Sequence, residues 1–249
     1  EVNIRTPRDN FYHCLVNSAH QFNYFEDGEN YILAGYPWFK CRARDMMIAL
    51  PGLTLANGEV DQFEACMKTM EKGVKEFIAG KPLSVKIHEM QHPDVLLWTT
   101  WCIQQYGKMV SMEKCIEKYA TLLKEIMDYL MAEKHPNLKV RDNGLLYAEG
   151  KDAAITWMNS TANGRPIVPR SGYIVEFNAL WYNALKFAEE ISATGTWKKS
   201  PNYADYAEKV EYSFKEVFLN EHGYLFDYVD ETNTSPDWSV RPNMIFAIA

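Results

Sequence analysis

Aromatic side chains stand beside charged side chains in four segments of this 249-residue sequence, at residues 35–45, 149–159, 176–181 and 237–241. Aromatic rings offer flat apolar faces, whereas carboxylates and arginines form strong and often paired hydrogen bonds. A sugar presents apolar C–H faces and a ring of hydroxyls, so this combination predicts a carbohydrate site. Aromatic and charged residues also meet where ordinary loops pack on helices, and composition alone leaves that interpretation open.

Each candidate side chain in these segments has a structural interpretation beside the functional one. Arg44 and Asp45 fit a clamp for sugar hydroxyls, or an ion pair at a helix start where an aspartate suits the helix dipole. Glu176 fits a substrate contact or a first-turn carboxylate. The tryptophans could stack on a sugar or pack in the core, and the loop carboxylates could act as catalytic acids or be solvated surface groups. These are Trp38, Trp157, Trp181, Glu149 and Asp152.

Other chemistries have little support in the sequence. It contains no glycine-rich nucleotide loop and no H-E-x-x-H zinc motif, and His88 and His92 lack the order that such a motif needs. The five cysteines form no C-x-x-C pair, so neither a zinc site nor a disulfide framework is expected. Reduced thiols are typical of the cytoplasm, which is the location that we predict.

The composition fits one large globular domain or two small ones. Hydrophobic residues make up 47% of the chain, which excludes disorder, and no stretch approaches the roughly 20 apolar residues of a membrane span. Lys and Arg number 26 against 33 Asp and Glu, so the net charge is −7. Because nucleic-acid binders carry a basic face, this balance argues against such a partner and favours a neutral, polar substrate.

Most segments place apolar residues at helical spacing. The predicted helices cover residues 10–24, 45–55, 59–79, 93–106, 111–133, 176–192 and 203–220. We expect Pro51 to interrupt the second helix. Residues 135–170 are rich in glycine, asparagine and proline, and predict a long functional loop with small hairpins. Residues 223–229 predict a short strand, and the apolar residues 244–249 predict the first turns of a buried helix.

The predicted elements indicate an all-α fold with a loop and hairpin region near residues 135–175. Several helices are apolar over more than half of their circumference, as in helices that pack on two sides. Together with loops of very unequal length, this pattern predicts either a closed α/α toroid or an irregular bundle.

Four segments, taken in order, resemble the C-terminal amylo-α-1,6-glucosidase domain of archaeal and bacterial glycogen debranching enzymes. They lie at residues 34–53, 142–159, 169–185 and 241–247, and contain the runs AGYPWF, RDMMIALPGL, DNGLLY, TWMN, VEFNALWYNAL and RPNMIFA. The stretch from Pro93 to Trp98 is a weaker match. The likeness spans nearly the whole chain, and the order of the segments makes it specific.

The resemblance implies a single (α/α)6 toroid domain over residues 1–249, incomplete in this chain and continuing beyond residue 249. It implies inverting hydrolysis of α-1,6-linked glucose in glycogen or a similar α-glucan, with two carboxyl groups and no metal or organic cofactor. Loops at one end of the helical ring would form the sugar pocket. The substrate-binding residues that the resemblance implies are Trp38, Arg44, Asp45, Asp94, Trp157, Glu176, Asn178 and Arg241.

Asn159 stands where the family's Thr-Trp-Met-Asp motif carries the proposed general acid. An amide is no ordinary proton donor to a glycosidic oxygen, so Asn159 is expected to hydrogen-bond substrate, and Asp152, Glu149 and Glu176 become candidate acids. The family's general base lies beyond the end of this chain. Three alternatives stay open: a non-catalytic glucan-binding module, another (α/α)6 hydrolase of the glucoamylase or trehalase type, and a scaffold without sugar affinity.

Overall fold

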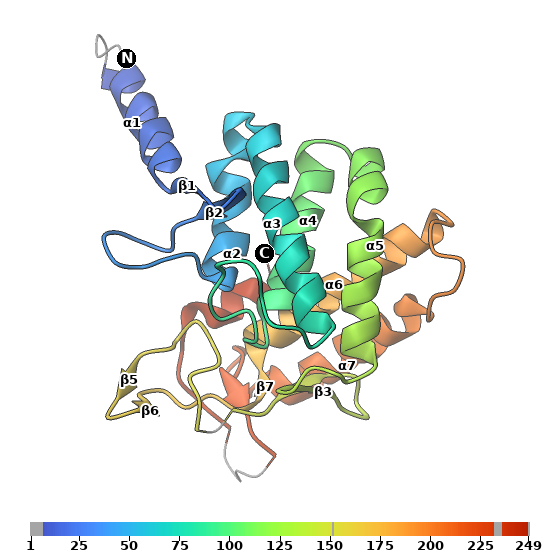
Figure 1. Ribbon diagram of the computed structural model, residues 1–249. Helices are drawn as coiled ribbons and strands as arrows, with labels where there is room; N and C mark the ends of the chain where they lie inside the picture. Colours follow the sequence, from blue (N-terminus) through green and yellow to red (C-terminus); the bar gives the residue numbers. More distant parts are fainter. Residues whose placement is uncertain (1–6, 151, 232–235, 249) are drawn as a thin grey trace. The chain divides into compact units, whose positions relative to one another are not determined.

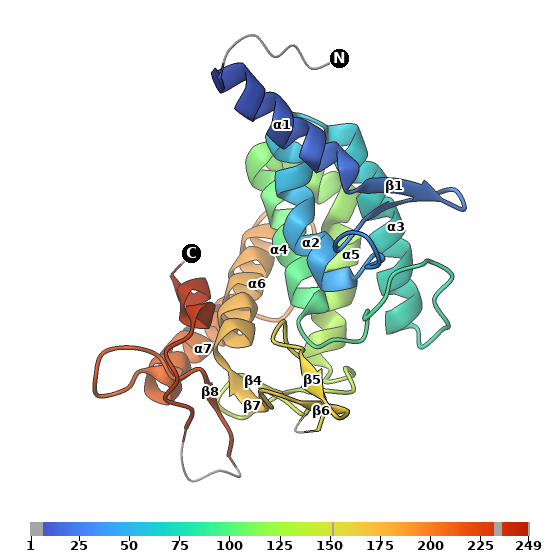
Figure 2. The same cartoon turned by 90° about the vertical axis from the view of Figure 1, so that its left-hand side faces the viewer.

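The computed structural model describes residues 7–150, 152–231 and 236–248 (Figures 1 and 2). It is about 52% helical, which confirms the prediction of a predominantly helical chain. Small antiparallel sheets accompany the helices.

Two compact units make up the chain. The first comprises residues 1–91 and 105–115, and the second comprises residues 92–104 and 116–249. Neither unit is therefore a continuous stretch of sequence. Helices α4 (Val95–Met109) and α5 (Met112–Met131) contribute residues to both units.

The first unit begins with a helix and a hairpin. Its elements are α1 (Pro7–Gln21), β1 (Asn23–Glu26), β2 (Glu29–Ile32), α2 (Ala43–Leu53), the 3₁₀ helix η1 (Leu55–Asn57) and α3 (Val60–Ile78). The β1–β2 turn holds Asp27 and Gly28 at φ angles of 51° and 84°, a region that glycine and aspartate enter at low cost. The helix predicted to reach Tyr24 is therefore too long, because the chain enters a strand after Gln21.

Helix α3 carries the apolar stripe that was predicted for it, and its bounds agree with the prediction to within one residue at each end. Phe63, Met67 and Met70 on this stripe are fully buried. Strand β2 packs against α3, and the Asn30 N–H donates to Thr69 Oγ1 at 3.1 Å. The hairpin is thus attached to the helix by a hydrogen bond as well as by apolar packing.

Helix α2 is continuous through Pro51, which corrects the expected interruption. A proline lacks an N–H, but Pro51 lies in the last turn of the helix, where only one backbone bond is lost. The Thr54 N–H and hydroxyl both donate to the Leu50 carbonyl, at 3.1 and 2.6 Å, and close the helix end.

The second unit contains a four-stranded antiparallel sheet in the order β3-β4-β7-β8, drawn beside α6 in Figure 2. The predicted loop region does hold hairpins, and parts of it also join this small sheet, which accompanies a predominantly helical fold. Beyond α4 and α5, the elements of this unit are β3 (Leu138–Val140), β4 (Leu146–Ala148), β5 (Thr161–Ala162), β6 (Arg165–Pro166), β7 (Gly172–Ile174), α6 (Val175–Ala193), α7 (Tyr203–Phe218), β8 (Tyr228–Val229) and the 3₁₀ helix η2 (Pro242–Ala247).

Side chains of α6 hold the sheet in place. Asn178 accepts from the Leu146 N–H at 2.7 Å and donates to the Leu146 carbonyl at 3.0 Å. Three residues further along α6, the Trp181 indole N–H donates to the Gly144 carbonyl at 3.1 Å. Buried backbone groups need such partners, so α6 fixes both β4 and the turn that precedes it.

Two predictions near the C-terminus are corrected. The expected strand at 223–229 is reduced to the two residues of β8. The expected buried helix is the 3₁₀ helix η2, in which Ile245 and Phe246 are exposed, so the apolar run does not fill a core in the described residues. No helix in the described part of the chain is long and apolar enough to cross a membrane.

Candidate functional site

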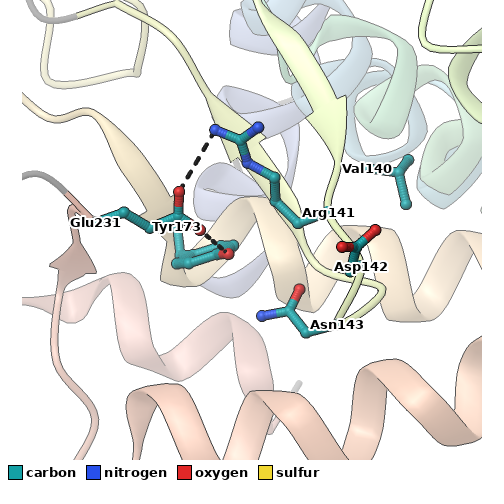
Figure 3. A pocket seen from close by; sticks show the side chains of 6 residues that line it. All are labelled: Val140, Arg141, Asp142, Asn143, Tyr173 and Glu231. Carbon is teal, nitrogen blue, oxygen red and sulfur yellow. Dashed lines mark hydrogen bonds and ion pairs between the residues drawn. The ribbon is translucent and has the colours of Figure 1, made fainter.

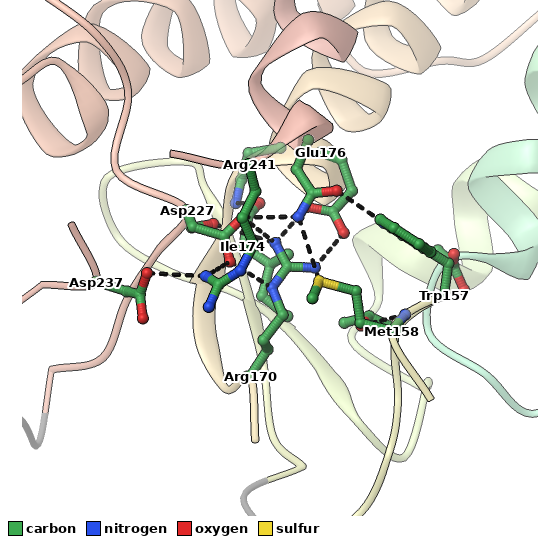
Figure 4. Close-up of polar contacts among 12 residues, drawn as sticks. Trp157, Met158, Arg170, Ile174, Glu176, Asp227, Asp237 and Arg241 are labelled. Atoms are coloured by element: carbon green, nitrogen blue, oxygen red, sulfur yellow. Dashed lines mark hydrogen bonds and ion pairs between the residues drawn. The ribbon is translucent and has the colours of Figure 1, made fainter. Parts of the chain in front are cut away.

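An ion pair between Arg170 and Glu176 lies where strand β7 leads into helix α6 (Figure 4). The pair is bidentate: Arg170 Nη1 donates to Glu176 Oε1, and Arg170 Nη2 donates to Oε2 at 2.7 Å. Neither side chain is more than 2% exposed. The planar guanidinium matches the carboxylate geometry, so the pair fixes the orientation of the loop before β7 against the first turn of α6.

Asp227 brings a second acid to the same guanidinium. Arg170 Nη2 donates to Asp227 Oδ1 at 3.0 Å, and Arg170 Nε lies 2.9 Å from Oδ2. The Asp227 carbonyl accepts from the Val175 N–H at 3.2 Å. Strand β8, which follows Asp227, is thereby tied to the β7–α6 junction through both its backbone and a buried charge.

Gly172 allows this close approach of β7 and β8. Its φ angle is 97°, and a Cβ atom at this position would lie 2.4 Å from the Val229 carbonyl oxygen and 2.8 Å from the Asp230 Cα atom. Only glycine fits this backbone conformation and this spacing without a shift of the backbone.

Arg241 and Asn243 also donate to the two oxygens of the Asp227 carboxylate. Arg241 Nη1 donates to Asp227 Oδ2 at 2.6 Å and to Asp237 Oδ1 at 2.8 Å, and Asn243 Nδ2 donates to Asp227 Oδ1 at 2.7 Å. Together with the Arg170–Glu176 pair, these residues form what we call the ion network. The side chains of Arg241 and Asp237 are each 20% exposed, so the network runs from a dry end to a wet end.

Trp157 is joined to this network through Asn243. The Trp157 indole N–H donates to Asn243 Oδ1 at 2.7 Å, while the residue as a whole is 46% exposed. The hydrogen bond holds the indole in place, and part of the residue stays open to solvent. A fixed and half-exposed indole that is hydrogen-bonded to an amide can stack on a sugar face.

Burial and ion pairing determine the protonation of Arg170 and Glu176 at the dry end of the network. Desolvation alone would lower the pKa of Arg170, but hydrogen bonds and charges from Glu176 and Asp227 raise it, so the guanidinium stays charged. Burial raises the pKa of Glu176, against the lowering effect of Arg170. Both oxygens of Glu176 are bonded to Arg170 and its side chain is 2% exposed, so this carboxylate is not open to a substrate in the structure.

The network unites three residues that the sequence indicated, namely Trp157, Glu176 and Arg241. Asn178 is fully buried and hydrogen-bonds the backbone of β4, and Trp181 is fully buried as well.

Other predicted residues of the second unit lie outside the network. Glu149 and Asp152 are exposed, and Asn159 is half-buried. Asp94 is buried and accepts from the Trp98 indole N–H at 3.2 Å.

The remaining candidates lie in the first unit. Arg44 is buried, Asp45 reaches the surface, and Trp38 is 75% exposed. Partial desolvation raises the pKa of Asp45, against the lowering effect of Arg44 and Arg42. The Arg42 guanidinium also lies 5.0 Å from the ring centre of Phe39, a cation–π contact that the sequence did not indicate.

Four members of the network were not predicted as site residues: Arg170, Asp227, Asp237 and Asn243. Arg170 stands at the end of the predicted functional loop, and Asn243 stands in the last matching segment, so each had a local signal. Asp227 had only a predicted strand around it. Among the described residues, no group of three or more His, Cys, Asp and Glu side chains could hold a metal ion.

Comparisons with known proteins agree with the sequence resemblance. The sequence model of the family described as amylo-alpha-1,6-glucosidase matches residues 14–249. No curated protein matches the chain. A solved Streptococcus pneumoniae structure, from a family of metal-independent alpha mannosidases in a non-productive complex with alpha-1,6-mannobiose, matches with a TM-score of 0.51 and 14% identity. The match covers 91% of this chain and 63% of that one, and at this identity it shows similarity of fold alone.

Proposed function

Because the chain belongs to the amylo-alpha-1,6-glucosidase family, we propose that it is a glycoside hydrolase that releases α-1,6-linked glucose from glycogen or a similar glucan, with inversion. The family match over residues 14–249 is the observation that carries this proposal. The proposal includes an (α/α)6 arrangement of the helices, and it needs no metal or organic cofactor.

The wet end of the ion network is where we place the sugar. Trp157 would stack on the face of one glucose unit, and Arg241 and Asp237 would bind hydroxyls of the same glucan. The dry end would act as support, since Arg170 and Glu176 hold β7 and α6 in register beneath these groups. Glu176 is then a positioning residue, because its oxygens are bonded to Arg170.

The first unit contributes a separate set of proposed binding residues. Asp45 is exposed, and Trp38 is a largely exposed aromatic platform, so both are accessible to a glucan. Arg44, which is buried, would orient Asp45 rather than stack on sugar.

The general acid is the open part of the mechanism. Inverting hydrolysis needs one carboxyl group to protonate the leaving oxygen and a second, about 6.5–9.5 Å away, to activate water. Asn159 cannot fill the first role in the ordinary way. Asp152 lies in the same loop and is exposed, so we propose it as the acid, with Asn159 as a hydrogen-bonding group for substrate.

A glucan-binding module without catalysis is the second candidate, and Asn159 is the observation that favours it. In that case the protein would bind branch glucose at the wet end of the network but would leave the glycosidic bond intact.

The test is glucose release from a phosphorylase-limit dextrin by the full-length protein and its variants. If the proposal holds, the natural protein releases glucose and Asp152→Asn lowers kcat at least about 100-fold, the usual share of a general acid. Asn163→Asp makes the matched amide-to-acid change at an exposed position of the same loop and should change nothing. Glucose release by the Asn159→Asp variant alone would establish that the natural protein is a binding module. The absence of glucose release from every variant would contradict the debranching assignment.

A further inference from the structure

A polar hollow of about 390 Å³ lies beside the turn that joins β3 to β4 in the second unit (Figure 3). This volume is in the range of about 300–1,000 Å³ that ligand pockets usually have. None of its lining residues belongs to the ion network or contacts Trp157 by a hydrogen bond. They are Val140, Arg141, Asp142, Asn143, Tyr173 and Glu231.

The turn beneath the hollow is held by two helices of its unit, α6 and α7. Trp181 of α6 donates to the Gly144 carbonyl, as described above, and Ser213 Oγ of α7 donates to the Asn143 carbonyl at 2.7 Å. Within the turn, Asn143 Oδ1 accepts from the Leu145 N–H at 3.1 Å. The backbone that presents Asp142 and Asn143 is therefore fixed before any ligand arrives, which lowers the entropy lost on binding.

The walls of the hollow are ordered by contacts among their own side chains. The Tyr173 hydroxyl donates to Glu231 Oε1, and Arg141 Nη2 lies 3.5 Å from Glu231 Oε2. The Arg141 guanidinium lies 4.3 Å from the ring centre of Tyr147, a cation–π contact. Burial and Glu231 both raise the pKa of Tyr173, so its hydroxyl keeps its proton at neutral pH.

Asp142 differs from these neighbours. It is exposed, and within the described residues its carboxylate has no hydrogen bond or ion pair. Ionised, it offers two acceptor oxygens to a ligand, next to the donor and acceptor of the Asn143 amide and the donors of Arg141. The hollow thus presents hydrogen-bond donors and acceptors together, and among the described residues the Asp142 carboxylate has no hydrogen bond of its own.

The charges and polarity of the hollow exclude several classes of ligand. One arginine and two carboxylates give a net charge of −1, which disfavours phosphate and other anions. The guanidinium disfavours a bare metal cation, and the polar lining disfavours an apolar ligand. A sugar hydroxyl both donates and accepts, so a ring with several hydroxyls matches the set.

We propose that this hollow is a second carbohydrate site, which binds one hexose unit of a neutral oligosaccharide away from Trp157 and the ion network. The inference rests on the proposed function only for the identity of the sugar as an α-glucan. Strand β7 supports the separation, because adjacent residues of a strand point to opposite faces, and Tyr173 lines the hollow while its neighbours Gly172 and Ile174 face the other way.

The test is retardation of the full-length protein in native gels that contain glycogen, compared with gels that lack it. Trp157→Ala is the background, since it weakens the first site and leaves the hollow intact. In that background we expect residual retardation, and Asp142→Ala should weaken the apparent affinity at least about threefold. Glu208→Ala removes the same charge from an exposed position of α7 and should have no effect.

A second variant guards against loss of structure in the turn. Glu231→Gln keeps an acceptor for the Tyr173 hydroxyl but loses the charge, and it should weaken retardation as well. Equal retardation of the background protein with and without Asp142→Ala would overturn the proposal, as would the absence of any retardation in the background. Glucose release is measured in parallel. If the protein releases glucose but Asp142→Ala does not change retardation, only the proposal for the hollow is wrong. If Asp142→Ala weakens retardation but no glucose is released, only the proposed hydrolysis is wrong.

Discussion

Two polar clusters of the second unit use the same residue types in opposite ways. In the ion network, Arg170 is fully buried and its guanidinium is shared by Glu176 and Asp227. In the hollow, the Arg141 side chain is 37% exposed and Asp142 next to it is uncommitted among the described residues. Burial forces charged groups to satisfy one another, because an unpaired buried charge costs several kcal/mol. Exposure leaves them available for a ligand.

The comparison separates support from recognition. The buried end of the network fixes β7, β8 and the start of α6, and only its wet end, with Trp157, is open to a substrate. The hollow reverses this arrangement, since its backbone is fixed from below by α6 and α7 while its side chains face solvent.

Replacing each arginine by methionine tests this difference most directly. Arg170→Met leaves Glu176 and Asp227 buried without their cation, and we expect the free energy of unfolding to fall by about 3–5 kcal/mol. Arg141→Met breaks only partly exposed contacts and should cost less than about 1 kcal/mol. Urea unfolding of the two variants beside the natural protein gives both values, and similar losses would remove the distinction between the clusters.

A buried histidine of the second unit extends the comparison to a group whose charged form is disfavoured. His135 is 1% exposed, and burial lowers its pKa to about 4, against the raising effect of Asp94 and with a smaller lowering effect of Lys139. Its folded pKa lies below the unfolded value of about 6.5, so its contribution to stability is complete above pH 6.5 and is lost as the pH falls toward 4. The loss is about 1.4 kcal/mol for each pH unit in that window, and about 3 kcal/mol across it.

Unfolding at several pH values measures this effect, with His135→Gln as the reference, because the carboxylates titrate in both proteins. The difference between the natural protein and the variant should change with pH between 6.5 and 4 and stay constant above 7. A difference that does not change in the acid window would show that His135 becomes charged without penalty.

The smallest expected difference between paired variants concerns strand β7, which carries Tyr173 of the hollow and lies between Arg170 and Glu176 of the ion network. Gly172→Ala places a Cβ atom 2.4 Å from the Val229 carbonyl oxygen, whereas Gly164→Ala, at a φ of 74°, meets nothing within 4 Å. Both changes strain a left-handed residue by about 1–2 kcal/mol. We expect Gly172→Ala to cost about 1–3 kcal/mol more, from the backbone shift.

Thermal unfolding of the two glycine variants provides the measurement. Gly172→Ala should also weaken binding at the wet end of the network, since β8 must move. Equal stability of the two variants would show that β7 and β8 separate freely.

The sequence predicted the helices best where one face is buried along the whole element. The stripe of α3 repeats at helical spacing from end to end, so its period alone located it. The β1–β2 hairpin was missed because its strands are four residues each and the aromatic residues before them continue the spacing of α1. Asp27-Gly28 is a strong turn signal and was available to correct this.

The candidate site was predictable only in part, for a reason of distance along the chain. Trp157, Glu176 and Arg241 stand in recognisable segments, and the structure joins them. Asp227, the acid that connects both arginines, lies 57 residues after Arg170, and no local pattern records that contact. The four-stranded sheet escaped prediction in the same way, because β3, β4, β7 and β8 contain only two or three residues each.

The spacing of the network also sets an order of assembly during synthesis. Arg170 and Glu176 are six residues apart, so they can meet soon after both have left the ribosome, whereas Asp227 follows 57 residues after Arg170 and Asn243 follows 16 residues later still. At about 5–20 residues per second, the nascent chain spends about 3–11 s with an arginine that has only one of its two acids. The direction of translation, rather than the strength of any one contact, thus determines when the edge strand β8 can be captured.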